Sequence, residues 1–332
     1  MKKIVLLLFL LVFSQPVFAD FADGEAAFGA KRYSEAMLYF RPLADAGDFR
    51  AQYYVAYLYL NGYGVTKNTA LGVEYLQKSL DHNYHLAQAL MGFLYAQGEV
   101  VPVDHKKAIS LYQKAADQGN TSAMLNLAVA YYLGNGVPRN LTRAIELLEK
   151  IPIDEQPSAG RYLGDIYMMR DSHKTDAAIR AYYAAAKAGD LAAYAALAKI
   201  YLDGTGVASD EERAARYYRY AAEQGYAPAQ YALGIMYVNG NGVEANSVLG
   251  HAWLTSAASQ NYEPATTALN QLKNEMSLTD LDRARQEFIN IQNNVIGHGV
   301  SPLESEVLQA AEEEEAAQER QKASRWNRRR RR

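Results

Sequence analysis

The sequence predicts an all-α protein, an α-solenoid of about six to seven stacked helix pairs that ends in a helical and disordered charged tail. Two segments of the chain are similar in sequence, namely AADQGNTSAMLNLAVAYYLGNGV at 115–137 and AAEQGYAPAQYALGIMYVNGNGV at 221–243. The chain has 332 residues, is 49% hydrophobic, carries a formal net charge of -3 and contains no cysteine. This length suits two domains or one elongated array, and the internal repeat favours the array.

The first 19 residues are expected to form a signal peptide. Lys2 and Lys3 precede an apolar run at 4–13, and Ala19 is a small residue at the position that signal peptidase requires. A membrane anchor would need roughly 18 apolar residues. We therefore expect cleavage after Ala19 and a periplasmic or secreted protein. Without cysteine, the exported chain depends on packing alone for its stability.

A constant register runs through the chain. Six units begin at alanines spaced by 34 or 36 residues, namely Ala51, Ala87, Ala123, Ala159, Ala193 and Ala229, and Ala265 continues the register. A tyrosine stands eight positions after each of the six, at Tyr59, Tyr95, Tyr131, Tyr167, Tyr201 and Tyr237. Apolar and small residues recur four and five positions on, so all these positions share one helical face. We expect the tyrosine hydroxyls to reach backbone groups at the following loop.

Glycines predict where the helices end. The first helix of most units stops at Gly62, Gly98, Gly134, Gly204 or Gly240, usually with a second glycine two residues later. The second helices stop at Gly47, Asn83, Gly119, Gly189, Gly225 or Asn261. Glycine and asparagine are the residues that best tolerate the left-handed helix cap. Each unit is thus a helix pair, and helix pairs must stack to bury their apolar faces.

The repeated columns resemble the Sel1-like repeat, a relative of the tetratricopeptide repeat. The pattern is A-x-x-x-L-G-x-x-Y-x-x-G-x-G-V followed by A-x-x-Y-Y-x-x-A-A-E-Q-G, and it is matched most fully by residues 221–243. The resemblance spans about 22–272. It implies a right-handed α-solenoid of Sel1-like units that binds other proteins and rarely catalyses a reaction.

The repeat register defines the expected organisation. Residues 20–50 are interpreted as an N-terminal capping half repeat of the tetratricopeptide type, 51–264 as the repeats, 265–300 as C-terminal capping helices and 301–332 as the tail. The unit that begins at Ala159 departs from the pattern because it has no glycine pair. Pro152 and Pro157 forbid a continuous helix across 151–158. This segment is either a hinge or an irregular turn.

Residues at offsets 2, 6 and 9 of the first helices lie on a face distinct from the recurring columns. First helices line the concave surface of related solenoids, so this stripe is the candidate partner-binding groove. Its members are Tyr53, Tyr57, Phe93, Val129, Tyr132, Arg161, Asp165, Lys199, Tyr231 and Ile235. Any one of these side chains could equally pack against the next unit.

Catalytic motifs are missing from the sequence. It contains no GxSxG, HExxH, SxxK, GxxxxGK[ST] or GxGxxG pattern, and His82 and His85 flank the expected helix stop at Asn83, which favours a solvated turn over a metal site. We expect no catalytic residue, metal or cofactor. The sequence favours an exported adaptor or scaffold of the cell envelope. The alternatives are a glycan-binding or exopolysaccharide-binding protein, and a secreted host-interaction factor or β-lactam-binding relative, the latter weakened by the lack of cysteine and SxxK.

The tail has segregated charge. Acidic residues at 312–315 precede an arginine-rich end, in which the candidate residues for an anionic surface are Trp326, Arg328, Arg329, Arg330, Arg331 and Arg332. The signal peptide argues against nucleic acid as the partner. Anionic lipid, lipopolysaccharide or an acidic protein are the expected partners. A tail that contacts only its own acidic block is the alternative.

Overall fold

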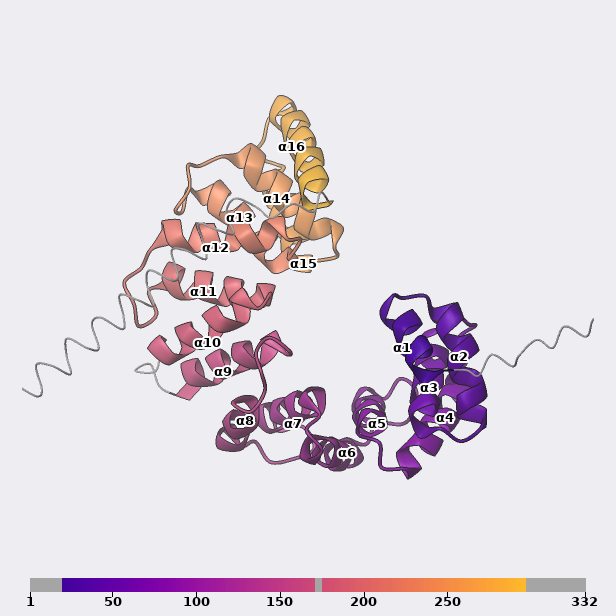
Figure 1. Cartoon of the computed structure of the whole chain (residues 1–332). Coiled ribbons are helices and arrows are strands. Elements are labelled where there is room, and N and C mark those ends of the chain that lie inside the picture. Colours follow the sequence, from indigo (N-terminus) through magenta and orange to yellow (C-terminus); the bar gives the residue numbers. More distant parts are fainter. Residues whose placement is uncertain (1–19, 171–174, 297–332) are drawn as a thin grey trace, which may run out of the picture. The chain divides into compact units, whose positions relative to one another are not determined.

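The computed structural model describes residues 20–170 and 175–296, and these residues form sixteen helices with no strand among them (Figure 1). The predicted signal peptide and the charged tail at 301–332 lie outside the described residues. The chain divides into two compact units, one up to Ala123 and one from Met124. Each unit is an all-α stack of helix pairs, as the sequence predicted.

Six helices lie in the N-terminal unit: α1 Phe21–Gly29, α2 Tyr33–Asp45, α3 Phe49–Asn61, α4 Thr69–Asp81, α5 His85–Gln97 and α6 His105–Asp117. The division between the units falls inside α7 Thr121–Leu133. The C-terminal unit continues with α8 Leu141–Leu148, α9 Pro157–Arg170, α10 Thr175–Lys187, α11 Leu191–Asp203, α12 Glu211–Glu223, α13 Ala227–Asn239, α14 Ser247–Ser259, α15 Glu263–Leu272 and α16 Leu278–Ile296. From α3 onward, each odd-numbered helix up to α15 is the first helix of a repeat, and each even-numbered helix up to α14 is the second.

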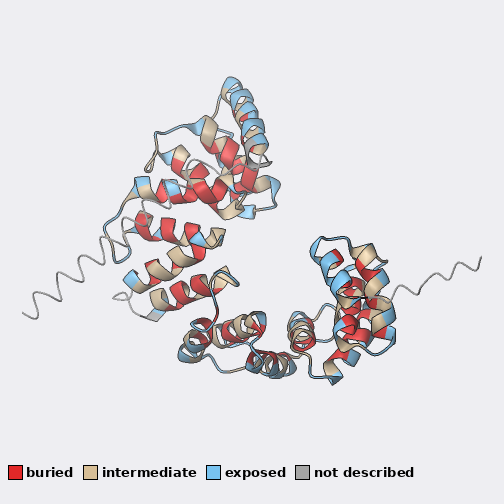
Figure 2. Ribbon diagram, viewed as in Figure 1, coloured by how far each residue is buried: buried red, intermediate tan, exposed pale blue. Residues whose placement is uncertain are grey.

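Small residues let the two helices of each pair approach closely. Ala51 and Ala56 in α3 are fully buried, and most helices carry buried residues along part of their length (Figure 2). A Cβ atom added at Gly92 would lie 2.8 Å from the Tyr112 ring, and one added at Gly164 would lie 2.6 Å from the Tyr182 ring. At the small column of the repeat, a side chain of the second helix therefore fills the space.

The loop inside each pair is fixed from both ends. Gly62 ends α3 in the left-handed conformation at φ 72°. Asn68 then donates its backbone N–H to the Tyr59 carbonyl at 2.9 Å, and its side chain accepts a hydrogen bond from the Leu71 N–H at the start of α4. The same N-cap position is occupied by Asp104, Asn140, Asp210 and Asn246. This column is part of the repeat, although the sequence analysis did not identify it.

The second glycine of the loop is needed for space as well as for its backbone angle. A Cβ atom at Gly64 would lie 2.4 Å from the Ser34 backbone nitrogen, and one at Gly242 would lie 2.1 Å from the Glu211 carbonyl oxygen. Ser34 and Glu211 lie at the start of the second helix of the preceding pair. The second glycine therefore allows each loop to pack closely against the preceding helix pair.

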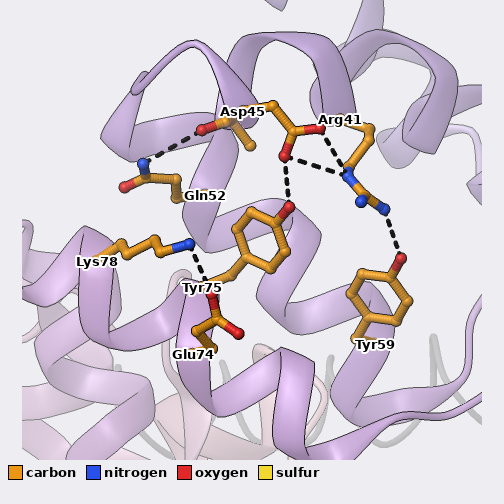
Figure 3. Close-up of polar contacts among 8 residues, drawn as sticks. Arg41, Asp45, Gln52, Tyr59, Glu74, Tyr75 and Lys78 are labelled. Atoms are coloured by element: carbon orange, nitrogen blue, oxygen red, sulfur yellow. Dashed lines mark hydrogen bonds and ion pairs between the residues drawn. The ribbon is translucent and has the colours of Figure 1, made fainter.

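The recurring tyrosines correct one expectation. Their hydroxyls were expected to reach backbone groups, but three of them bond to a side chain eighteen positions earlier. Tyr59 accepts from Arg41 at 2.7 Å (Figure 3), Tyr167 donates to Glu149 at 3.2 Å, and Tyr237 accepts from Arg219 at 3.2 Å. Arg41 and Arg219 lie on the second helix of the preceding pair, and Glu149 directly follows that helix. These hydroxyls therefore link successive pairs, because the tyrosine faces the neighbouring helix instead of its own loop.

Buried glutamines make a second link between pairs. Gln230 is 1% exposed, donates to the Ala222 carbonyl at 3.1 Å and accepts from Gln260 at 2.8 Å. Gln88 is equally buried and accepts from Gln118 at 2.8 Å, thirty positions later. These hydrogen bonds satisfy polar groups that would otherwise be costly to bury.

The predicted break at 151–158 is a short turn. Pro152 accepts hydrogen bonds from the N–H groups of Glu155 and Gln156, both at 3.1 Å, and α9 begins at Pro157. Proline suits the first helical position because its missing N–H needs no partner there. The preceding helix, α8, has only 8 residues, against 13 in α6. The irregular unit still forms a pair, because α9 packs on α10 through Gly164.

The last helix covers the end of the array. In α16, Ala284 is fully buried and Ile291 is 8% exposed, while Gln292 donates to the Ser256 hydroxyl of α14 at 3.3 Å. The opposite face carries Leu278, which is 82% exposed. One side of α16 thus closes the C-terminal core, and the other faces solvent.

Candidate functional site

The candidate residues of the N-terminal unit lie in a surface of packed aromatic rings. The Tyr53 ring centroid lies 6.4 Å from that of Tyr57 and 5.8 Å from that of Tyr84. Tyr53 also packs against the core of the unit, and burial raises the pKa of its hydroxyl to about 12. Its hydroxyl therefore stays neutral at physiological pH. The structure brings Tyr53 and Tyr57 together, as their four-residue spacing on one helix requires.

Three further aromatic residues extend this surface. The Phe28 ring lies 5.6 Å from Tyr57 and 5.4 Å from Tyr33, and Tyr33 stacks on Tyr63 at 4.8 Å with an interplanar angle of 14°. Tyr63 is 40% exposed. We call the set Phe28, Tyr33, Tyr53, Tyr57, Tyr63 and Tyr84 the aromatic surface. Phe28, Tyr33, Tyr63 and Tyr84 were not predicted from the sequence, because none of them stands at the register positions of the candidate groove.

Phe93 occupies, on α5, the register position that Tyr57 occupies on α3. It is 44% exposed, which is unusual for a phenylalanine in a packed helix pair. Exposed aromatic side chains of this kind supply contact area at protein interfaces. Among the candidate residues of the N-terminal unit, Phe93 is the one most accessible to a partner.

Arg161 and Asp165, two of the three charged candidates of the C-terminal unit, belong to one polar cluster. Arg161 donates from its Nε to Asp190 at 3.0 Å, and its Nη1 lies 3.7 Å from the Asp165 carboxylate. Asp165 accepts a hydrogen bond from the Tyr182 hydroxyl at 2.7 Å. Burial raises the pKa of Asp165 above its usual value. This cluster ties α9 to α10 and to the start of α11.

Tyr132 borders this cluster. Its ring lies 5.9 Å from that of Tyr162, and the Arg161 guanidinium lies 4.4 Å from the centroid of the Tyr162 ring. Burial and the nearby Asp165 carboxylate raise the pKa of the Tyr132 hydroxyl. The structure therefore brings Tyr132 together with Arg161 and Asp165, although Tyr132 comes from the preceding repeat.

The remaining candidates lie apart from this cluster. Val129 is half-buried on α7, and Lys199 is exposed and pairs with Asp203 at 2.8 Å. Tyr231 and Ile235 pack against the core formed by α14 and α15, and the Tyr231 ring lies 5.6 Å from Tyr262. Tyr231 and Ile235 are thus engaged in packing between successive pairs.

A cleft of about 920 Å³ lies elsewhere in the C-terminal unit, between the α11–α12 loop and the α13–α14 loop. Its acidic lining includes Glu211, Glu212 and Glu244. Glu211 and Glu212 lie in the first turn of α12, where negative charge stabilises the helix dipole. Helix stability therefore accounts for these two acids.

His82 and His85, which are close in the sequence, contact different residues. The His82 ring stacks on Phe49 at 5.5 Å, and His85 Nδ1 lies 3.0 Å from the Asn120 amide nitrogen. Over the described residues, no group of three or more histidine, cysteine, aspartate or glutamate side chains could hold a metal ion. Within the same ranges, every helix is too short or too polar to cross a membrane.

The helix pairs, glycine caps and interlocking loops define an all-α repeat protein. The Sel1 repeat family model matches residues 49–84, 85–120, 121–151, 191–226 and 227–262, which is more than half of the chain. The protein belongs to the Sel1 repeat family, whose repeats generally mediate protein–protein interactions. The unmatched stretch between the matched repeats, 152–190, contains the irregular unit of α9 and α10.

The chain is similar to several solved structures, and one with a TM-score above 0.5 supports the same fold. A Sel1 repeat protein from Oxalobacter formigenes is 26% identical, with a TM-score of 0.66 over 73% of this chain and 100% of that chain. An immunity protein from Pseudomonas aeruginosa is 22% identical, with a TM-score of 0.42 over 66% of this chain and 88% of that chain. A protective antigen of uropathogenic Escherichia coli is 22% identical, with a TM-score of 0.32 over 85% and 87% of the two chains. Among curated proteins, none matches the chain.

Proposed function

We propose that this protein is a non-catalytic adaptor that binds a segment of a partner protein on the first-helix side of its N-terminal unit. The observation that carries the proposal is the combination of Phe93, 44% exposed on α5, with the aromatic surface on and around α3. Phenylalanine and tyrosine make rigid anchors, because few rotatable bonds are frozen on binding. Family membership supports a protein as the partner.

An extended segment suits this arrangement. Repeat arrays present a long surface built from successive first helices, and extended peptides can follow such a surface. Tyr57 and Phe93 hold the same register position on successive first helices, so a partner segment would meet an aromatic side chain from each repeat. Hot spots of interfaces are rich in aromatic residues of this kind.

Export to the cell envelope is the second part of the proposal. Lys2 and Lys3, the apolar run at 4–13 and Ala19 have the order of a secretory signal. The arginines at 328–332 would then meet anionic lipid or lipopolysaccharide, because each arginine near an anionic surface contributes about 1 kcal/mol. N-terminal sequencing of the exported chain should begin at Asp20. A chain that retains residues 1–19 would contradict export with cleavage.

A glycan is the second candidate ligand, and one observation favours it. Tyr33 and Tyr63 stack nearly in parallel, and Tyr63 is 40% exposed. A sugar ring could pack on such an exposed aromatic face. Protection of tyrosine fluorescence by an oligosaccharide, with loss of that protection in Tyr63→Ala, would favour the glycan over a protein.

Site-specific crosslinking tests the protein-binding proposal. A photoreactive phenylalanine analogue is placed at Phe93 or at Leu38, which is 74% exposed on the second helix α2 of the same unit. Both positions are exposed and apolar, so they differ mainly in the helix that carries them. We expect a partner to crosslink from position 93 and not from position 38. Equal crosslinking from both positions, or from position 38 alone, would contradict the proposal.

A further inference from the structure

A carboxylate lies half-buried among tyrosines in the irregular unit of the array. Asp165 stands at the register position that holds Tyr57, Phe93, Val129, Lys199 or Ile235 in the other units. One of its oxygens accepts the Tyr182 hydroxyl at 2.7 Å, and the other lies 3.7 Å from Arg161, beyond hydrogen-bonding distance. The Asp165 side chain is 29% exposed. A carboxylate has about four acceptor sites, so this one can accept further donors from solvent or from a ligand.

The neighbouring arginine is already neutralised. Arg161 donates to Asp190 at 3.0 Å, and the Asp190 side chain is only 10% exposed. Together, Arg161, Asp165 and Asp190 carry one positive and two negative formal charges, which leaves a charge of -1. The excess charge resides on Asp165, the acid whose contact with Arg161 is longer. A further cation, Arg139, lies at the Tyr132 ring, 6.0 Å from its centroid, whereas the groups that act on Asp165 are Tyr182, Arg161 and Asp190. At Asp165 itself the local charge therefore favours an incoming cation over an anion.

Two aromatic rings complete the surroundings. Tyr132 from α7 and Tyr162 from α9 are half-buried, with ring centroids 5.9 Å apart at an angle of 60°. Tyrosine faces attract cations through their ring quadrupole, and a planar guanidinium can stack on a ring while it donates to a carboxylate. The chain already uses this contact at both rings, because Arg161 lies over the Tyr162 ring and Arg139 over the Tyr132 ring, so an incoming guanidinium would meet the remaining ring surface.

We propose that Asp165, with Tyr132 and Tyr162, binds a basic side chain of the partner protein, with arginine preferred over lysine. This inference rests on the proposed function of protein binding, and it adds a second recognition point within the C-terminal unit. A charge pair in this half-buried setting is screened less than one on the open surface. The irregular unit thereby contributes specificity that the regular units lack.

Short peptides test the proposal without the natural partner. The probe is acetyl-Ala-Ala-Arg-Ala-Ala-amide, and the control probe carries citrulline, a neutral relative of arginine of nearly the same shape. Binding to the mature full-length chain is followed at low salt by the NMR signals of labelled tyrosine rings. We expect the arginine peptide to shift the signals of Tyr132 and Tyr162, the citrulline peptide to leave them unchanged, and a lysine peptide to bind more weakly.

A matched pair of variants separates this site from general charge effects. Asp165→Asn keeps an oxygen that can accept from Tyr182 but loses the negative charge, and it should weaken binding of the arginine peptide at least fivefold. Asp203→Asn removes another acid of the same unit, one paired with Lys199 at 2.8 Å, and should leave the affinity unchanged. Equal losses in both variants, or tighter binding of a glutamate peptide than of the arginine peptide, would overturn the proposal.

The carboxyl group itself gives a readout that needs no variant. The charged and titratable groups that face Asp165 are Arg161 from its own helix, Tyr182 from α10, Asp190 before α11 and Tyr132 from α7. Burial raises the Asp165 pKa in the free protein, and a bound guanidinium favours the ionised form. The pKa should fall when the arginine peptide is added. An unchanged pKa at saturating peptide would refute the site, whereas the crosslinking at Phe93 tests the proposed function separately.

Discussion

Individual glycines in this array serve different physical needs. Gly242 and Gly189 both have positive φ, at 64° and 99°. A Cβ atom at Gly242 would lie 2.1 Å from the Glu211 carbonyl oxygen, whereas one at Gly189 would have no atom within 4 Å. Gly189→Ala should cost about 1 kcal/mol for its backbone conformation. Gly242→Ala should cost at least about 2 kcal/mol more, because the neighbouring pair must also move. Urea unfolding of the two variants measures the difference, and equal losses would contradict it.

Asp45 is one of the carboxylates that make the stability of the fold sensitive to acid. Hydrogen bonds from Tyr75 and Arg41 hold the pKa of Asp45 below its usual 3.8 (Figure 3). The folded pKa is thus lower than the unfolded one, so the stabilisation is present above pH 3.8 and is lost as pH falls through the folded value. Asp45→Asn should therefore melt below wild type at pH 6, and the gap should narrow as pH falls toward 2. A gap that stays constant across this range would refute the assignment.

At the scale of the element, each second helix depends on its N-cap. The Asn246 side chain accepts from the Leu249 N–H at 3.0 Å, and its own N–H donates to the Tyr237 carbonyl at 2.7 Å. Asn246→Ala keeps the backbone contact and loses the cap, which should cost about 1 kcal/mol. Asn246→Asp keeps an acceptor and should unfold at nearly the same urea concentration as wild type. If the alanine and aspartate variants were equally stable, the cap would not matter.

Helix boundaries were predictable from sequence because the residue that ends a helix must adopt a left-handed backbone conformation, which glycine and asparagine tolerate best. Asn83 and Asn261 adopt φ of 58° and 62°, as their type allows. The tyrosine contacts were predicted wrongly, because the direction of a hydroxyl depends on the preceding pair, which the local sequence does not show. The N-cap column was missed because asparagine and aspartate alternate in it, although either one serves as a cap.

The candidate site was predictable only where it follows the register. Tyr53 and Tyr57 were found from their spacing, and their contact follows from one helical turn. Phe28, Tyr33 and Tyr63 join them through tertiary packing between α1, α2 and the loop after α3, which carries no periodic signal. Arg161 and Asp165 were selected as separate groove positions. Their link to Asp190 and Tyr182 depends on how α9, α10 and α11 pack, and that packing sets the charge of the cluster.

At the scale of the whole molecule, some positions of the repeat serve stacking and others serve recognition of a partner. Alanine, glycine and tyrosine columns recur because every pair must stack on the next, whereas aromatic and charged residues on the first helices vary between units. Stability in such arrays is a sum over neighbouring pairs. A substitution at an exposed first-helix position should therefore change binding while leaving the melting temperature nearly unchanged.

The affinity of the partner identified by crosslinking tests the central claim most directly. It should be measured for wild type, for the double variant Tyr57→Ala, Phe93→Ala, and for Leu38→Ala as the control on a second helix. Loss of an aromatic hot spot costs about 2 kcal/mol, or roughly thirtyfold in Kd. We expect at least that loss for the double variant and none for Leu38→Ala. The affinities are compared well below the melting temperatures, because Tyr57→Ala also removes a ring contact with Phe28. Wild-type affinity in the double variant would show that the aromatic surface of the N-terminal unit does not bind the partner.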